Sequence, residues 1–116
     1  MTEQYTTMSR EALAAAQSVA EEHGHHEITP LHLAATLIED TQGLSAAVLQ
    51  KLGVDLAGLR KAVAQALDHL PRSEGSSLSM SSSLASVLRE AGKLATSWED
   101  EYVSVEHLLL AMLANP

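Results

Sequence analysis

Hydrophobic residues recur three and four positions apart in six stretches of the chain, with polar residues between them. This spacing places the apolar side chains on one face of a helix with about 3.6 residues per turn, so it predicts amphipathic helices. The predicted helices run from about Met8 to His23, Pro30 to near Thr41, Leu44 to Leu52, Leu56 to Leu70, Leu84 to Leu94 and Val105 to Leu113. No stretch alternates apolar and polar residues over the length of a strand, so we predict an all-α fold.

One helix–turn–helix pattern occurs twice, at a constant offset in the numbering and without a gap, which predicts a pseudo-twofold helical domain. The matching pairs are Leu13 and Leu88, Ala16 and Ala91, Ala20 and Ala95, Ile28 and Val103, Thr29 and Ser104, His32 and His107, Leu33 and Leu108, Leu37 and Met112, and Ile38 and Leu113. We place the first copy at about 8–70, a flexible Ser-rich linker at about 71–83 and the second copy at about 84–116 within one domain, 1–116.

The second copy has two predicted helices against four in the first, so it is incomplete. We therefore expect Leu109, Leu110 and Met112 to be exposed or to be covered by a neighbouring molecule.

Local signals mark several helix ends. Thr29-Pro30 and Ser104 are predicted starts, because a hydroxyl side chain caps free backbone N–H groups and proline suits the first turn. Asp55 is a predicted cap of the fourth helix, and Thr6 or Thr7 of the first. Gly53 is a predicted left-handed stop.

The composition indicates a single domain with a core of small and aliphatic side chains. The 116 residues are 46% hydrophobic but 3% aromatic, and no Cys is present, which excludes disulfides and thiolate metal sites. The formal net charge is −8 and the seven Lys and Arg are scattered, which argues against nucleic-acid binding. Because no segment has the features of a signal peptide or a membrane span, we expect a cytoplasmic protein that binds no membrane.

A phosphate-binding loop is missing from the sequence. Gly92-Lys93 is followed by Leu94 where a Ser or Thr would bind the metal, and no glycine stands at the required upstream position. We predict that this chain has no cofactor and no enzymatic activity of its own.

Two groups of histidines are candidates for chemistry. His23, His25 and His26 could bind zinc, nickel or copper, but such a local cluster lacks the spread ligands of a structural site. We favour a solvated polar turn and predict no metal; weak metal binding, or a small metal-dependent hydrolase, is the alternative. His32 and His107 each stand three residues after a hydroxyl residue, Thr29 or Ser104, so we predict helix caps rather than general bases.

The turn after the fifth helix carries acids and aromatics. Glu99, Asp100 and Glu101 could form an acidic pair for hydrolysis, although a solvated turn is favoured. Trp98 and Tyr102 flank the turn and could either anchor a peptide at the rim of a groove or cover the core.

Several segments resemble the N-terminal domain of the Clp ATPases. Ile28–Leu33 and Asp100–Leu113 resemble its first and second repeat signatures, and Ala66–Pro71 with the following Gly- and Ser-containing connection is most similar to the ClpB branch of protein disaggregases. The resemblance covers nearly the whole chain. The family domain continues with two further helices, a linker and two ATPase modules, so we expect an isolated N-terminal piece.

The resemblance implies a substrate-receiving module of a stress-response AAA+ chaperone. In the family this domain sits flexibly on a hexameric ATPase ring and binds unfolded or aggregated polypeptide in an apolar groove between the repeats. The family's substrate-binding positions fall on Thr6, Asp100 and Glu106, with apolar groove positions at Leu88 and its neighbours. Leu88 also fits the apolar stripe of its own helix, so a place in the core is the alternative for it. His107 stands where some relatives carry an apolar residue, which implies a more polar groove. The alternative is an adaptor- or specific-peptide-binding domain of another Clp ATPase, which feeds a protease or dismantles a secretion machine.

Overall fold

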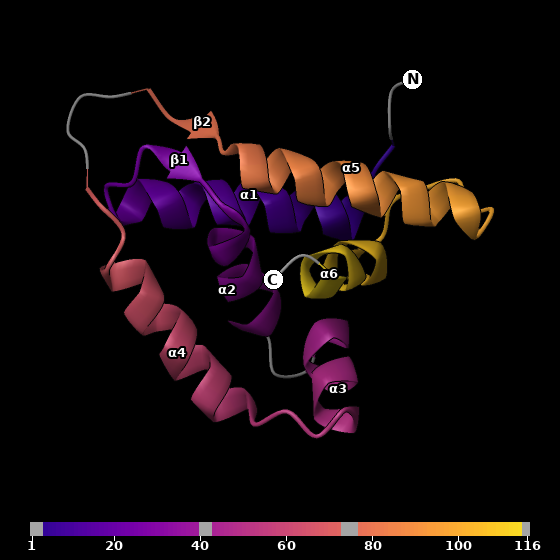
Figure 1. The fold of residues 1–116 in the computed structure, drawn as a ribbon, viewed down its shortest axis with the longest axis horizontal. Coiled ribbons are helices and arrows are strands. Elements are labelled where there is room, and N and C mark those ends of the chain that lie inside the picture. The colour runs from indigo at the N-terminus through magenta and orange to yellow at the C-terminus, as the bar shows by residue number, and fades with distance from the viewer. Residues whose placement is uncertain (1–3, 40–42, 73–76, 115–116) are drawn as a thin grey trace.

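Helices form most of the structure, which confirms the predicted all-α class (Figure 1). The computed structural model describes residues 4–39, 43–72 and 77–114. Its elements are α1 (Thr7–Glu22), β1 (Glu27–Ile28), α2 (Pro30–Glu39), α3 (Leu44–Lys51), α4 (Leu56–Asp68), β2 (Ser79–Met80), α5 (Ser82–Ser97) and α6 (Val105–Ala114).

The two copies of the repeat pair with each other through exchanged backbone segments. β1, which precedes α2, runs parallel to β2, which precedes α5. Tyr5, before α1, forms the equivalent parallel bridge with Val103, before α6. The N–H of Ser81 donates to the carbonyl of Ile28 at 2.9 Å, and the N–H of Thr6 donates to that of Val103 at 3.0 Å. Tyr5 and Val103 stand at the repeat positions that correspond to paired residues of β2 and β1. The two copies therefore share the same backbone pairing as well as the same sequence pattern.

The predicted linker is too long at its C-terminal end. β2 lies within it, and Ser81 caps α5, which begins two residues before Leu84. The hydroxyl of Ser81 accepts a hydrogen bond from the N–H of Leu84 at 3.0 Å. Serine is typical of loops for the same reason that it is typical of caps, since its side chain hydrogen-bonds to nearby backbone. The Ser-rich composition therefore could not distinguish a loop from the capped start of a helix.

Helices α1 and α5 end in the same left-handed turn. Gly24 (φ 71°) and Glu99 (φ 60°) occupy the left-handed position after the last helical turn. In each turn the N–H of the following residue donates a hydrogen bond to a carbonyl five residues upstream. His25 donates to Ala20 at 2.9 Å, and Asp100 donates to Ala95 at 2.8 Å. This is the Schellman arrangement, which glycine adopts without strain and glutamate does not.

The other predicted helix ends have mixed outcomes. Gly53 adopts a left-handed conformation (φ 85°) after α3, as predicted. Asp55 does occupy the position before α4, but its side chain makes no capping hydrogen bond, so the predicted role of its carboxylate is wrong.

One hydrophobic core joins both copies, and a second lies under α4. The first core draws on α1, α2, α5 and α6, and α1 packs most closely with α2 as α5 does with α6. Ala16 and Ala91 are fully buried, and such small side chains allow the helices to approach closely. The second core packs α4 and α3 against α2, around Ile38, Leu49 and Leu67.

The C-terminal helix is better covered than its sequence predicts. Leu109 is buried, because α3 of the first copy packs against α6, so its expected exposure is wrong. Leu110 is 38% exposed, as expected, and Met112 is partly buried. Helix α3 of the first copy thus provides part of the cover of α6.

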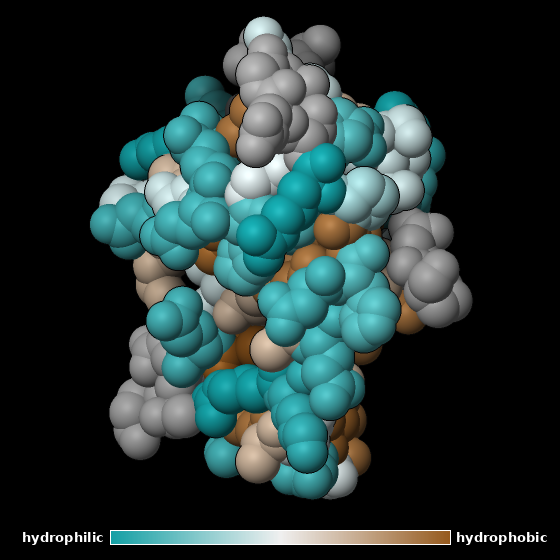
Figure 2. All heavy atoms as spheres, turned by 90° about the vertical axis from the view of Figure 1, so that its left-hand side faces the viewer, coloured by the Kyte–Doolittle hydropathy of each residue, from teal (hydrophilic) through white to brown (hydrophobic). Residues whose placement is uncertain are grey.

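The face at the left of Figure 1 is mainly polar. Figure 2 turns this face toward the viewer and shows mostly hydrophilic residues, with hydrophobic ones visible in recesses between them. Helices α3 and α6, which carry the exposed residues Leu44 and Leu110, lie toward the other side in Figure 1. Within the described residues, no helix combines the length and the apolar character that crossing a bilayer requires.

Candidate functional site

A histidine caps the start of α2 and of α6. The backbone N–H of Thr29 donates to Nδ1 of His32 at 2.9 Å, and that of Ser104 donates to Nδ1 of His107 at 2.8 Å. The two hydroxyl oxygens lie 2.9 and 2.8 Å from the same nitrogens. Each histidine therefore satisfies a backbone donor that the helix itself leaves free.

These contacts fix the protonation of both rings. A backbone N–H can only donate, so Nδ1 of His32 carries no proton and the proton of the neutral ring is on Nε2. That Nε2 lies 2.8 Å from Nδ1 of His25 and donates to it. The ring of His25 also hydrogen-bonds to the backbone carbonyl of Leu67, near the end of α4. A series of neutral hydrogen bonds thus joins α2, the α1–α2 turn and α4.

The histidine pair of the first copy is withdrawn from solvent. His32 is fully buried and His25 is 7% exposed, so the prediction of a solvated turn is wrong for His25. Burial, and then the His25 and His23 rings, lowers the pKa of His32 to about 4. Burial, followed by His23 and Arg72, also lowers the pKa of His25. Both rings are neutral at physiological pH, which matches their hydrogen bonds.

The remaining histidines of the turn differ in their surroundings. His23 stacks on His25 with ring centroids 5.4 Å apart, and its Nδ1 lies 2.9 Å from the carbonyl of Val19. His26 is exposed. In the part of the chain that the structure describes, no three or more His, Asp or Glu side chains are grouped so that they could hold a metal ion.

The second copy closes its cap with a carboxylate. Asp100 is the repeat counterpart of His25, and its Oδ2 accepts from Nε2 of His107 at 2.9 Å. Trp98, the counterpart of His23, packs its indole against His107 with ring centroids 5.0 Å apart and an interplanar angle of 50°. The side chain of Asp100 and the whole of Trp98 are each 49% exposed. The predicted solvated turn therefore carries a bonded carboxylate and a half-exposed indole.

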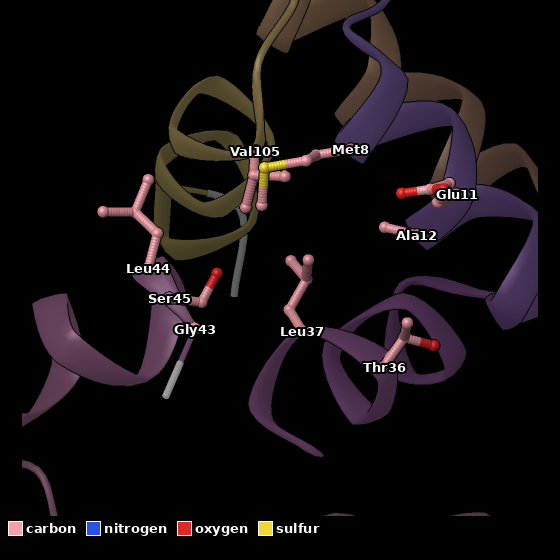
Figure 3. Close-up of a pocket in the computed structure, with 9 residues that line it drawn as sticks. All are labelled: Met8, Glu11, Ala12, Thr36, Leu37, Gly43, Leu44, Ser45 and Val105. Atoms are coloured by element: carbon pink, nitrogen blue, oxygen red, sulfur yellow. The ribbon is translucent and has the colours of Figure 1, made fainter. Parts of the chain in front are cut away.

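Two adjoining apolar pockets lie beside this turn. The Met8 pocket, of about 220 Å³, is framed by side chains from α1, α2, α3 and α6 (Figure 3). Its lining is Met8, Glu11, Ala12, Thr36, Leu37, Gly43, Leu44, Ser45 and Val105. The Trp98 pocket, of about 240 Å³, is lined by Leu44, Ser45, Val48, Trp98, Val105, Glu106, Leu109 and Leu110. The two pockets share Leu44, Ser45 and Val105, so they lie on either side of the contact between α3 and the start of α6.

Both pockets have an apolar interior and an acidic edge. Glu11 lines the Met8 pocket, Glu106 lines the Trp98 pocket, and both residues are exposed. None of the described lining residues is a Lys or an Arg. A ligand that combines an apolar group with a positive charge suits this chemistry.

The structure separates the four residues that the family resemblance implied for substrate binding. Glu106 lines the Trp98 pocket. Asp100 does not line it, but Asp100 bonds His107, whose ring packs against the pocket residue Trp98. The Oγ1 atom of Thr6 caps α1 by accepting from the N–H of Ser9 at 3.1 Å. Leu88 is partly buried against the first core and lines neither pocket.

Sequence reasoning missed Met8 and Leu44 as pocket residues, and it expected Leu110 to be exposed without assigning it to a pocket; all three line the pockets and are exposed. The available signal was the run Leu108-Leu109-Leu110, because consecutive apolar residues cannot all face the core from one helix. Met8 and Leu44 each fit the apolar stripe of their own helix. Only the packing of the helices shows that these two side chains remain accessible.

Comparisons with known proteins agree on one type of domain. Residues 4–116 match the family model described as the Clp repeat (R) N-terminal domain. Over 113 residues the chain is 39% identical to the chaperone protein ClpB of Bacillus anthracis, a match that covers 93% of this chain and 13% of ClpB. The chain thus spans about an eighth of that relative's length.

Solved structures share the fold. The N-terminal domain (1–163) of the ClpV1 ATPase from the E. coli EAEC Sci1 type VI secretion system is 28% identical, with a TM-score of 0.88 over 97% of this chain and 69% of that one. A ClpV N-domain solved in complex with a VipB peptide is 24% identical, with a TM-score of 0.83 over 97% and 69% of the two chains. At that identity the second comparison shows the fold alone.

Proposed function

Because the chain belongs to the family of Clp N-terminal domains, we propose that it binds unfolded or aggregated polypeptide on behalf of a ClpB-like chaperone. The rest of a hexameric AAA+ ATPase supplies ATP hydrolysis, and this chain contributes binding without catalysis or cofactor. The proposed location is the cytoplasm. The ClpB relative supports the branch, and the two pockets support the activity.

The observation that carries the proposal is where the exposed apolar side chains gather. Eight large hydrophobic residues of the described chain are exposed, and Met8, Leu44, Trp98 and Leu110 among them line the two pockets. Exposed apolar side chains scattered singly need no explanation, but a concentration of them around pockets marks a binding surface.

The geometry suits an extended chain rather than a folded partner. Each pocket has room for a large side chain, and the two adjoin across the α3–α6 contact. An extended polypeptide presents side chains along its length and can enter both. The carboxylates of Glu11 and Glu106 favour segments that carry Lys or Arg beside the apolar residue. Ordering a flexible ligand is costly, so capture is weak and reversible, as delivery to an ATPase requires.

The test is the affinity for a fluorescein-labelled, reduced and carboxymethylated lactalbumin, measured by fluorescence anisotropy. Trp98→Ala and Leu110→Ala should each weaken binding about five- to thirtyfold, because truncating an anchor in a pocket costs about 1–2 kcal/mol. The matched control is Leu52→Ala, which removes a 66% exposed leucine outside both pockets. Unchanged helicity by circular dichroism shows that the variants remain folded.

Two results would count against the proposal. One is normal binding by both pocket variants. The other is an equal loss of binding in Leu52→Ala, which would indicate nonspecific adhesion to exposed leucines. Glu106→Gln extends the test, since it should weaken binding of a Lys-containing apolar peptide more than that of a neutral one.

A second candidate is recognition of one specific peptide or adaptor protein for another Clp ATPase. The observation in its favour is that a ClpV N-domain of the same fold was solved with a VipB peptide. A pull-down that returns one folded partner, rather than many unfolded chains, would favour this alternative.

A further inference from the structure

His107 is held at both nitrogens of its ring. Nδ1 accepts from the N–H of Ser104, and Nε2 donates to the carboxylate of Asp100. The side chain of His107 is 3% exposed, so protein surrounds it on nearly all sides. Two directional bonds, one at each nitrogen, together with burial restrict the orientation of the ring.

The fixed ring of His107 supports the indole of Trp98. The two rings lie 5.0 Å apart between centroids, and Trp98 is also one of the residues that line the Trp98 pocket. Trp98 is the last residue before the left-handed turn, and Asp100 follows on the same turn. The Asp100–His107 bond therefore ties the segment that carries the indole to the first turn of α6, which carries Glu106.

We propose that Asp100 and His107 are positioning residues that hold Trp98 as a wall of the Trp98 pocket, so that Asp100 influences polypeptide binding through His107 rather than by direct contact. This inference rests on the proposed function of the pocket. The competing explanation is that the half-exposed carboxylate of Asp100 attracts a positively charged ligand itself.

Two substitutions of Asp100 distinguish these explanations. Asp100→Asn removes the charge but keeps an oxygen that accepts from Nε2 of His107, whereas Asp100→Ala removes both. Positioning predicts that Asn binds the labelled lactalbumin like the parent protein. It predicts that Ala binds it roughly two- to tenfold more weakly, the effect of having to order one released side chain on binding. Direct attraction predicts equal losses in both variants.

A second readout does not depend on any ligand. Trp98 is the only tryptophan of the chain, so acrylamide quenching of its fluorescence reports its position directly. Quenching should increase in Asp100→Ala and stay at the parent value in Asp100→Asn. Glu101→Ala, which removes an equal charge from an exposed residue of the same loop, is the control and should leave quenching unchanged.

The outcomes separate the two proposals. Equal quenching in all variants, or equal losses of affinity in Asp100→Asn and Asp100→Ala, would overturn the positioning role. If the parent protein binds no polypeptide, the proposed function fails while the quenching pattern still decides whether Trp98 is positioned. If Asp100→Ala does not fold, His107→Gln decides instead. It keeps an acceptor for Ser104 but removes the supporting ring, so it should raise quenching, and an unchanged value would refute the inference.

Discussion

Acid should destabilise this fold through the buried histidine pair, and His32→Gln should remove most of that effect. In the native state Nδ1 of His32 accepts from Thr29 and Nε2 donates to His25, so a further proton can enter His32 only by breaking the bond to Thr29. A glutamine at the same position can still accept from the N–H of Thr29, as it does in a capping box, so the variant should fold at neutral pH. We expect it to lose about 1–2 kcal/mol there, the contribution of the lost bond to His25.

The magnitude follows from the pKa of His32, which burial lowers from 6.5 to about 4. Between these values the unfolded chain binds a proton that the native protein does not, so stability is complete above pH 6.5 and falls as the pH falls toward 4. One pKa unit corresponds to about 1.4 kcal/mol, so the full loss approaches about 3 kcal/mol. The pKa of His25 is also lowered, by burial and then by His23 and Arg72, so this residue acts in the same direction. Its hydrogen bond to Leu67 and the charge of Asp68 partly offset these effects.

Urea unfolding followed by circular dichroism at pH 7.5 and 4.5 measures this effect. The stability advantage of the parent protein over His32→Gln should shrink by about 2–3 kcal/mol across this range and can change sign. Carboxylates titrate in both proteins, so they cancel in the difference. A difference that stays constant with pH would refute the assignment. So would an equal change in pH dependence from His26→Gln, which removes an exposed imidazole of the same turn.

Four further substitutions should change the free energy of unfolding measured in the same way. Glu99→Gly should raise this free energy by about 0.5–1 kcal/mol, because glycine adopts the left-handed conformation without strain. Gly24→Ala at the equivalent turn should lower it by about 1–2 kcal/mol, and changes of the same sign in both variants would contradict this explanation. Ser81→Ala should cost about 1 kcal/mol through loss of the α5 cap, and an equal cost from the exposed neighbour Ser82→Ala would contradict the capping role. Leu108→Ala should cost about 2–5 kcal/mol because Leu108 is fully buried in the core that both copies share, and a loss below about 1 kcal/mol would show that this core is loosely packed.

Helix positions were predictable because their signals are local. Apolar spacing located all six helices of the described chain, and Thr29 and Ser104 marked the starts of α2 and α6. The constant offset between the copies also implied that they fold alike, although it could not show that their backbone segments exchange partners. Exchange depends on how the copies pack together, which no single copy encodes.

The pockets were not predictable, because they depend on packing between copies. Each lies where α3 of the first copy meets α6 of the second, and Leu44 and Val105 are far apart in the sequence. For Leu88 the family position and the helical stripe pointed to different roles, and its packing against the core supports the stripe. The burial of His25 was not predictable either, because it depends on the packing of α4. The ring of His25 hydrogen-bonds to the backbone carbonyl of Leu67 in that helix.

The relation between His25 and Asp100 shows what the repeat preserves. In both copies the capping histidine uses its second nitrogen to donate, so each copy needs an acceptor at the same place. In the first copy this place is 7% exposed, and an ionised carboxylate there would lose most of its hydration, whereas a neutral imidazole both accepts from His32 and donates to Leu67. In the second copy the side chain is 49% exposed, so a carboxylate keeps its water and accepts the bond at little cost. The preserved feature is therefore the hydrogen bond, and burial decides which residue provides it, which is why two dissimilar residues occupy equivalent positions.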